Sequence, residues 1–164
     1  MFNDKYGLTE AVLTRYKTIT RRNKDNYEVG EIIAIAQRYS QIEKEIENLG
    51  LPLDMKESVK KHKGYGNKMF VKAEDMPHHI KIKSKRIERL QSISNSDCLK
   101  EGIIPYEDPN RDDSSHSITG YTFTGGNIYD TPYEAFKALI IKLNGPNFWY
   151  SNPKVFVFEF ELVD

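Results

Sequence analysis

The fold of this chain is decided around the segment Thr14-Arg15-Tyr16-Lys17-Thr18-Ile19-Thr20-Arg21-Arg22. Its β-branched residues, Thr18, Ile19 and Thr20, prefer an extended backbone and predict a strand from Lys17 to Arg22. The strand carries one lysine, two threonines and two arginines, a dense set of groups that can bind or react. We therefore look for a functional site here.

A short helix is expected just before this strand. Thr9 is a favourable N-cap residue with Glu10 in the first turn, and Leu8 and Leu13 have the spacing of a hydrophobic staple across the cap. The helix should end near Arg15, so that the chain turns from helix to strand immediately before the lysine.

Three further strands are predicted after the first. The run from Ile32 to Ala36 is apolar on both faces, which is typical of a central strand. Met69 to Ala73 has the composition of a short strand, and His79 to Leu90 alternates apolar with basic residues. Because the alternation slips, we expect a β-bulge between Ser84 and Arg86.

The last strand runs from Val155 to Val163 and alternates throughout. The side chains on its aromatic face are predicted to form the core, and the other face to be less buried. The aromatic face holds Phe156, Phe158, Phe160 and Leu162, and the other face holds Val155, Val157, Glu159 and Glu161.

The region 40–66 has the pattern of a helical insertion. Ser40 and Glu43 form a capping box, and Asp54 and Glu57 predict the start of a second short helix. The first of these helices should end before Gly50 and bury an apolar stripe made of Ile42, Ile46 and Leu49.

Two more helices are expected in the second half of the chain. One runs from about Asn95 to Glu101 and is closed by Gly102, and another begins at Thr131 with a proline at its first position. The region 104–130 is rich in Asp, Ser, Asn, Gly and Pro and predicts a long irregular loop. The buried stripe of the last helix consists of Ala135, Phe136, Leu139, Ile140 and Leu143.

The bulk composition favours one globular domain over residues 1–164, and the mixture of predicted strands and helices without an alternating βαβ order makes its class α+β. The chain has 164 residues, of which 38% are hydrophobic and 12% aromatic, enough for one core. The net charge is zero, but residues 56–89 hold eleven Lys or Arg against four Asp or Glu, whereas residues 97–164 hold five against eleven. The basic stretch is either a phosphate-facing patch or a solvated strand face.

Residue usage argues against several classes of protein. Cys98 is the only cysteine, so the chain has no internal disulfide, and we expect Cys98 to be a core residue. The N-terminus lacks an apolar leader and the longest aliphatic run, Ile32 to Ala36, is short, so we expect a cytoplasmic protein without a membrane segment. We expect no metal site and no cofactor, because the histidines are scattered: His62, His78, His79 and His116.

Segment 14–22 resembles the signature of the ASCH family, in which a helix, a turn and a Lys-Thr-x-Thr-x-Arg-like strand line the mouth of a PUA-like β-barrel. Arg15-Tyr16 stands where that family commonly has glycine followed by arginine or lysine. The resemblance, also to longer phage-type and bacterial members, covers most of the chain outside 40–66 and 104–120. It implies a PUA-like mixed β-barrel of about five to six strands with flanking short helices. Further segments that resemble the family are residues 28–31, 90–94, 101–103 and 152–160.

Within that superfamily, this pattern is similar to that of the amidohydrolases that remove acetate from N-acetylcytidine. Lys17, Thr20 and Glu101 match their lysine, their threonine and the glutamate after the following helix. The resemblance implies that Lys17 takes the proton of Thr20, that Thr20 attacks the amide carbonyl, and that Glu101 transfers a proton to the leaving amine. In a regular strand, residues three apart face opposite ways, so the backbone must turn between Lys17 and Thr20.

Binding is nevertheless expected slightly ahead of catalysis, because a fold that serves many functions supports a catalytic site only as far as the residues match, and a protein-interaction domain is the third alternative. A binding module would grip RNA or a nucleotide through phosphate contacts of Lys17, Arg21 and Arg22, with Thr18 and Tyr16 beside them. A protein-interaction domain would have lost ligand binding. Oligomeric state is not indicated by any pattern. Aromatic residues that could stack on bases are Tyr65, Tyr121, Phe123, Trp149 and Tyr150.

Overall fold

A computed structural model describes residue 2 and residues 4–48, 59–109 and 118–163. It has a mixed α+β architecture, with six strands in two antiparallel sheets and short helices around them. The expectation of an α+β fold is therefore confirmed. The larger sheet is open, because its two outer strands do not pair with each other. The described residues therefore do not form a closed barrel.

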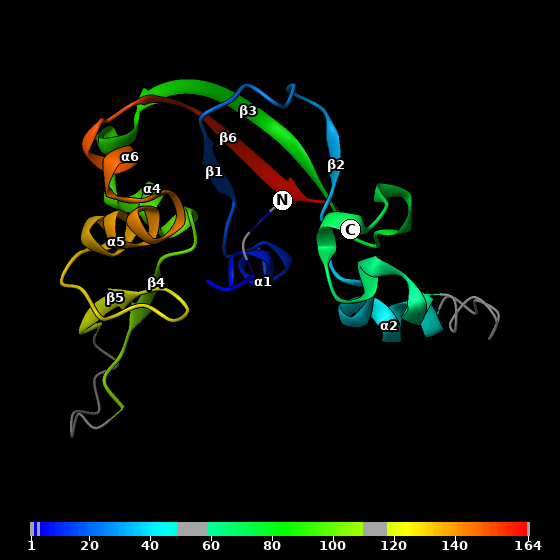
Figure 1. Cartoon of the computed structure of the whole chain (residues 1–164). Coiled ribbons are helices and arrows are strands. Elements are labelled where there is room, and N and C mark those ends of the chain that lie inside the picture. Colours follow the sequence, from blue (N-terminus) through cyan, green and yellow to red (C-terminus); the bar gives the residue numbers. More distant parts are fainter. Residues whose placement is uncertain (1, 3, 49–58, 110–117, 164) are drawn as a thin grey trace.

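The larger sheet has the order β1-β6-β3-β2, and every neighbouring pair is antiparallel. Its strands are β1 (Ile19–Arg22), β6 (Lys154–Leu162), β3 (His79–Arg89) and β2 (Ile32–Ala34). The two long strands, β3 and β6, form an arc across the molecule (Figure 1). The prediction that Ile32 to Ala36 is a central strand is wrong: β2 is a three-residue edge strand whose Ile32 is 61% exposed.

The slip in alternation along β3 is a real irregularity of the sheet. Its pairing with β6 shifts register between Ile82 and Ser84, slightly before the predicted place between Ser84 and Arg86. The bulge lets the strand curve, so that Ile80 and Ile82 lie in the core while the later basic residues reach the site described below.

The closing strand β6 is buried on both faces rather than on the aromatic face alone. Phe158 and Phe160 are core residues as predicted, packed by the rings of Tyr27 and Phe2, whose centroids lie 5.2 and 5.7 Å away. Phe156 is only half-buried. The other face is covered near the start of the strand, where Val155 and Val157 are fully buried.

Helix α1 (Leu8–Leu13) precedes β1 as expected, but its N-cap is Gly7, and Thr9 lies inside the helix, so the assignment of Thr9 as N-cap is wrong. Gly7 has a left-handed φ of 65°. The helix ends at Thr14, and Arg15 takes a left-handed φ of 62° that reverses the chain.

Helix α2 (Tyr39–Asn48) confirms the first helix of the insertion, and Ile42 on it is buried. The predicted second helix and the rest of the apolar stripe lie outside the described side chains. The predicted strand from Met69 to Ala73 is wrong. That segment overlaps two 3₁₀ turns instead, Lys68–Phe70 and Ala73–Asp75, and a third 3₁₀ turn, Lys63–Tyr65, precedes them.

The remaining helices gather at one side of the arc, opposite α2 (Figure 1). They are α4 (Asn95–Lys100), α5 (Pro132–Asn144) and α6 (Pro146–Tyr150), preceded by a 3₁₀ turn, Leu90–Ser92. Within the predicted loop 104–130, β4 (Ile104–Tyr106) pairs with β5 (Gly120–Thr122), so the expectation of an irregular loop throughout was wrong.

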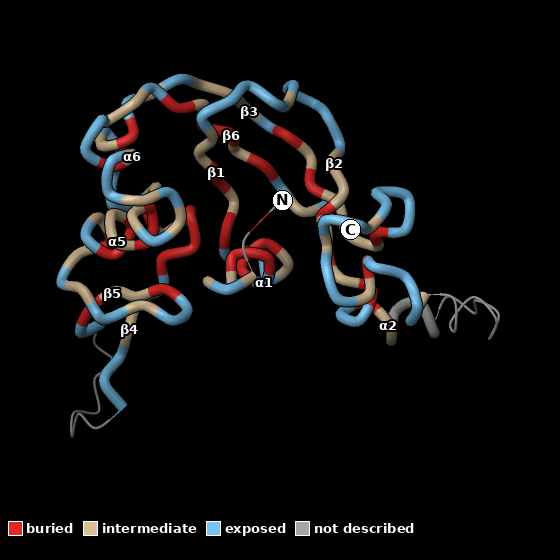
Figure 2. The backbone as a smooth tube through the Cα atoms, in the orientation of Figure 1, coloured by how far each residue is buried: buried red, intermediate tan, exposed pale blue. Residues whose placement is uncertain are grey.

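The core joins the sheet to the helices on its concave side. Buried residues run along β6 and β3 and continue through α1 and α5 (Figure 2). On α5 the predicted stripe is largely confirmed, with Ala135, Phe136, Leu139 and Ile140 buried. Cys98 is fully buried in this core, as expected.

Candidate functional site

A cleft of about 420 Å³ lies where β1, the end of α4 and helix α5 come together. Its walls come from segments that are far apart in the sequence. Its polar walls include Lys17, Thr20, Arg21, Arg22, Lys68 and Glu101, and its apolar walls include Phe2, Leu90, Phe136, Phe148 and Val155. The three residues predicted as catalytic therefore line one cavity.

The position of Lys17 follows from the turn after α1. The left-handed Arg15 reverses the chain, and the Lys17 backbone N–H then donates to the Ala11 carbonyl at 2.7 Å. Because β1 begins only at Ile19, Lys17 precedes the strand, and strand alternation does not force it away from Thr20. Both side chains reach the same cleft.

The Lys17 ammonium is surrounded by oxygen atoms. Nζ donates to the Ile19 carbonyl at 2.7 Å, to the Glu101 carbonyl at 2.8 Å and to Glu101 Oε2 at 2.5 Å. An ammonium has three N–H donors, so every one of them has an acceptor. Lys17 is 2% exposed, and this ion pair is therefore almost completely out of water.

Burial lowers the pKa of Lys17 below its ordinary value. The Glu101 carboxylate opposes this change because it stabilises the charged form, whereas the positive charges of Arg22 and Arg21 add to it. Burial is the largest of these influences. The outcome is a lysine that gives up a proton more readily than a lysine in water.

Gly102 allows Glu101 to come this close. It follows α4 with a φ of 103°, a conformation that favours glycine, and ends the helix so that Glu101 is its C-cap. A β-carbon on Gly102 would lie 3.3 Å from Leu8 Cδ2 and 3.7 Å from Lys17 Cδ. The glycine thus lets the end of α4 pack against α1 and the Lys17 side chain.

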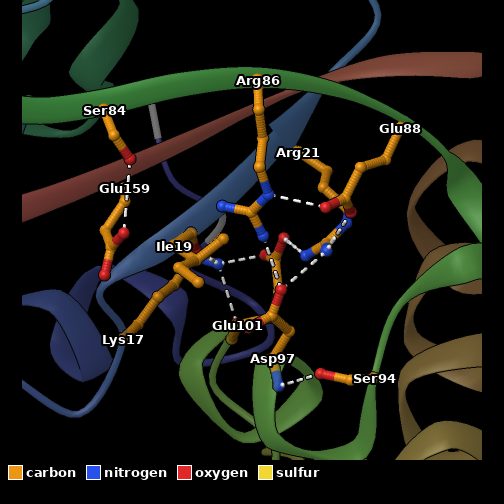
Figure 3. Close-up of polar contacts among 10 residues, drawn as sticks. All are labelled: Lys17, Ile19, Arg21, Ser84, Arg86, Glu88, Ser94, Asp97, Glu101 and Glu159. Carbon is orange, nitrogen blue, oxygen red and sulfur yellow. Dashed lines mark hydrogen bonds and ion pairs between the residues drawn. The ribbon is translucent and has the colours of Figure 1, made fainter.

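Arg21 extends the charged network away from the cleft. Its Nη1 donates to Glu101 Oε1 at 3.0 Å, and its Nη2 donates to Glu88 Oε2 at 3.1 Å and to Asp97 Oδ2 at 3.2 Å (Figure 3). The side chain is 2% exposed. A phosphate group would have to compete with three carboxylates for this guanidinium, which was predicted as a phosphate ligand.

An outer arginine completes the network on the solvent side. Arg86 donates from Nε to Glu88 Oε1 at 2.6 Å and from Nη2 to Asp97 Oδ2 at 2.7 Å. Burial alone would raise the pKa of Glu88, but the hydrogen bonds from Arg86 and Arg21 outweigh it, and the pKa of Glu88 is lowered. Ser94, the N-cap of α4, accepts the Asp97 backbone N–H and so fixes the first turn that carries this carboxylate.

The other predicted site residues are placed less centrally. Thr20 is 5% exposed, and its side chain lines the cleft. Thr18 is half-buried. Tyr16 is 39% exposed, and its hydroxyl donates a hydrogen bond to the Ile103 carbonyl. Neither residue lines the cleft. Arg22 does line it, with its guanidinium carbon 5.7 Å from the centre of the Phe2 ring.

Several residues of the site were not foreseen from the sequence. Phe2 and Lys68 line the cleft, and Lys68 Nζ donates to Asp4 Oδ1 at 2.7 Å and also to the Phe2 carbonyl. Glu88 and Asp97 were likewise missed as partners of Arg21. Apart from the basic run around Lys68, no local sequence signal marks these positions.

The remaining candidates lie elsewhere. Burial raises the pKa of the Cys98 thiol to about 12, which makes it a poor nucleophile. Of the aromatic residues considered for base stacking, Phe123 and Trp149 are core residues and Tyr150 is exposed. His116, one of the scattered histidines, lies outside the described residues.

Over the described ranges, no three His, Cys, Asp or Glu side chains are grouped so as to hold a metal ion. No described helix has the length and apolar character needed to cross a bilayer.

Comparison of the chain with known protein families, with curated proteins and with solved structures finds no match.

Proposed function

We propose that this protein is an ASCH-type domain of PUA-like architecture whose cleft hydrolyses the amide of an N-acylated nucleoside. The observation that carries the proposal is the convergence of Lys17, Thr20 and Glu101 on one cleft, with Lys17 and Glu101 in contact at 2.5 Å. Each of these residues is at most 5% exposed. A buried acid–base pair that lines the same cleft as a hydroxyl group can activate that hydroxyl as a nucleophile.

The turn before Lys17 also supports the resemblance. The family commonly has glycine two residues before this lysine, and Arg15 at that position adopts a left-handed φ of 62°. Glycine adopts this conformation at no steric cost, whereas arginine does so at about 1 kcal/mol. A left-handed residue at this position is compatible with a family pattern that has glycine there.

The proposed reaction begins with the transfer of a proton from the Lys17 ammonium to the Glu101 carboxylate. This transfer is favoured by the burial that lowers the pKa of Lys17. The neutral amine then accepts the hydroxyl proton of Thr20 while the Thr20 oxygen attacks the amide carbonyl. When the C–N bond breaks, Glu101 gives its proton to the leaving nitrogen. Water finally hydrolyses the threonyl ester, which releases the carboxylic acid and restores the hydroxyl.

Incubation with N-acetylcytidine tests this proposal directly. We expect the wild-type protein to release cytidine, detected by chromatography, because the amide carbonyl can reach Thr20 in the cleft. The variants Lys17→Met and Glu101→Gln should lose turnover, because each removes one half of the proton-transfer pair. Circular dichroism must show that each variant is folded at the assay temperature. Absence of turnover by the wild-type protein at high concentration would exclude this substrate.

A second candidate function is the binding of RNA or a nucleotide. It is favoured by Arg22, Lys68 and Asn23, which line the cleft next to the rings of Phe2 and Phe148. Cationic side chains attract phosphates, and aromatic faces stack on unpaired bases. This function needs no reaction at Thr20.

Salt-dependent titration distinguishes the second candidate from the first. If the cleft binds single-stranded RNA, affinity measured by fluorescence anisotropy should fall as salt rises. Arg22→Gln should then reduce the slope of log affinity against log salt by about 0.7, the value for one lost contact to single-stranded nucleic acid. An affinity without salt dependence would exclude phosphate recognition.

A further inference from the structure

The Arg21 side chain is the centre of the charged network, yet the proposed reaction makes no use of it. Its guanidinium contacts Glu101, Glu88 and Asp97 at 3.0 to 3.2 Å. The Phe136 ring lies on a further side, with its centre 6.0 Å from the guanidinium carbon. Strand β3 supplies Glu88, helix α4 supplies Asp97 and ends at its C-cap Glu101 (Figure 3), and α5 supplies the ring, so three elements hold one side chain.

The Glu101 carboxylate lies between two cations, with a separate donor for each oxygen. Oε2 accepts from Lys17 Nζ at 2.5 Å, and Oε1 accepts from Arg21 Nη1 at 3.0 Å. The carboxylate cannot rotate away from Lys17 without losing the second bond, because charge-assisted bonds to both oxygens fix its plane. Arg21 thus sets the orientation of Glu101 from the side opposite Lys17.

We propose that Arg21 is a positioning residue, which holds the Glu101 carboxylate against Lys17 and is itself held by Glu88 and Asp97. The catalytic meaning of this assignment rests on the proposed hydrolase function. The assignment differs from phosphate binding, because carboxylates already occupy Nη1 and Nη2 of Arg21, which leaves Nε as the nitrogen without a hydrogen-bond partner. A side chain that is 2% exposed and fixed from three elements is suited to orienting a neighbour.

Arg21 acts on Lys17 through two routes. The charged groups with the largest influence on Lys17 are Glu101 at the end of α4 and Arg22 and Arg21 on β1. The positive charge of Arg21 directly disfavours the ammonium. Arg21 also shares the negative charge of Glu101, which would otherwise act on Lys17 alone. Loss of Arg21 should therefore raise the pKa of Lys17 by both routes.

The experiment is an NMR titration of the Lys17 side chain in protein labelled with ¹³C at lysine Cε. Relative to the wild-type protein, we expect the Lys17 titration to move to higher pH in Arg21→Met. Arg21→Lys keeps the charge but replaces the planar, forked guanidinium with a compact ammonium, which holds the Glu101 carboxylate less firmly, so it should move the titration in the same direction by less. Arg21→Lys also provides the test of the assignment if Arg21→Met fails to fold. The pH profile of hydrolysis should shift in parallel, with about a tenfold loss of kcat/KM at pH 7.

Arg86→Met is the matched control. Arg86 bonds Glu88 and Asp97 as Arg21 does, but it makes no contact with Glu101. We expect its removal to leave the Lys17 titration close to that of the wild-type protein. An unchanged titration in both Arg21 variants, or an equal shift in Arg86→Met, would overturn the assignment of Arg21. A shift specific to Arg21 in a protein without hydrolase activity would keep the assignment and reject the proposed reaction.

Discussion

The Thr20→Val variant is expected to lose amide hydrolysis by about 10³-fold or more while keeping the fold. Valine has nearly the shape of threonine and is a good strand residue, so the pairing of Thr20 with Phe158 in the sheet should survive. The substitution replaces only the hydroxyl group, with a methyl group. Because the proposed reaction forms a covalent ester at this oxygen, no other described group of the cleft replaces it.

Initial rates with N-acetylcytidine, together with thermal unfolding of the same samples, check this expectation. Thr9→Val is the matched control, because Thr9 is also 5% exposed but lies in α1 and does not itself line the cleft. It should retain activity even though it loses its hydrogen bonds with Asp4 and Lys68. If Thr20→Val kept full turnover, Thr20 would not be the nucleophile. The Lys17–Glu101 pair would then have to activate water instead.

The elements predicted best are those with a local cause. Thr131 and Pro132 begin α5, and Ser94 begins α4, because capping groups satisfy backbone donors within one turn. The edge position of β2 could not be predicted in this way. Ile32 to Ala36 is apolar throughout, but position in a sheet depends on which strands pair with it, and only β3 does. The short helix-like turns at Lys68–Phe70 likewise override a local preference for strand.

The same distinction applies to the site. The pattern around Lys17 and Thr20 is local, and the resemblance to a family linked it to Glu101, which is 84 residues from Lys17. Glu88 and Asp97 had no such link. They lie 67 and 76 residues from Arg21 and meet it only after β3 and α4 have packed beside β1. Arg21 was therefore predicted as a phosphate ligand, because its carboxylate partners were not visible in the sequence.

Glu101→Gln is expected to destabilise the protein by about 3–5 kcal/mol at pH 7, the usual cost of leaving one half of a buried ion pair without its partner. The variant leaves the Lys17 ammonium with two backbone carbonyls and no carboxylate, and Arg21 loses one of its three acidic partners. Urea denaturation at several pH values provides the measurement. Lys17→Met/Glu101→Gln should recover part of the loss, because it removes the buried charge as well.

The pH dependence of Glu101→Gln separates this cause from a packing defect. Burial already lowers the pKa of Lys17 below 10.5, and loss of the carboxylate removes the main influence that raises it. Between the folded-state pKa and 10.5 the unfolded chain binds more protons than the folded chain, so stability should rise with pH in that window. Glu161→Gln is the surface control, because the Lys83–Glu161 pair is about half-exposed and should contribute at most about 1 kcal/mol. A loss in Glu101→Gln as small as in this control would mean that water reaches Lys17, and the proposed lowering of its pKa by burial would then be untenable.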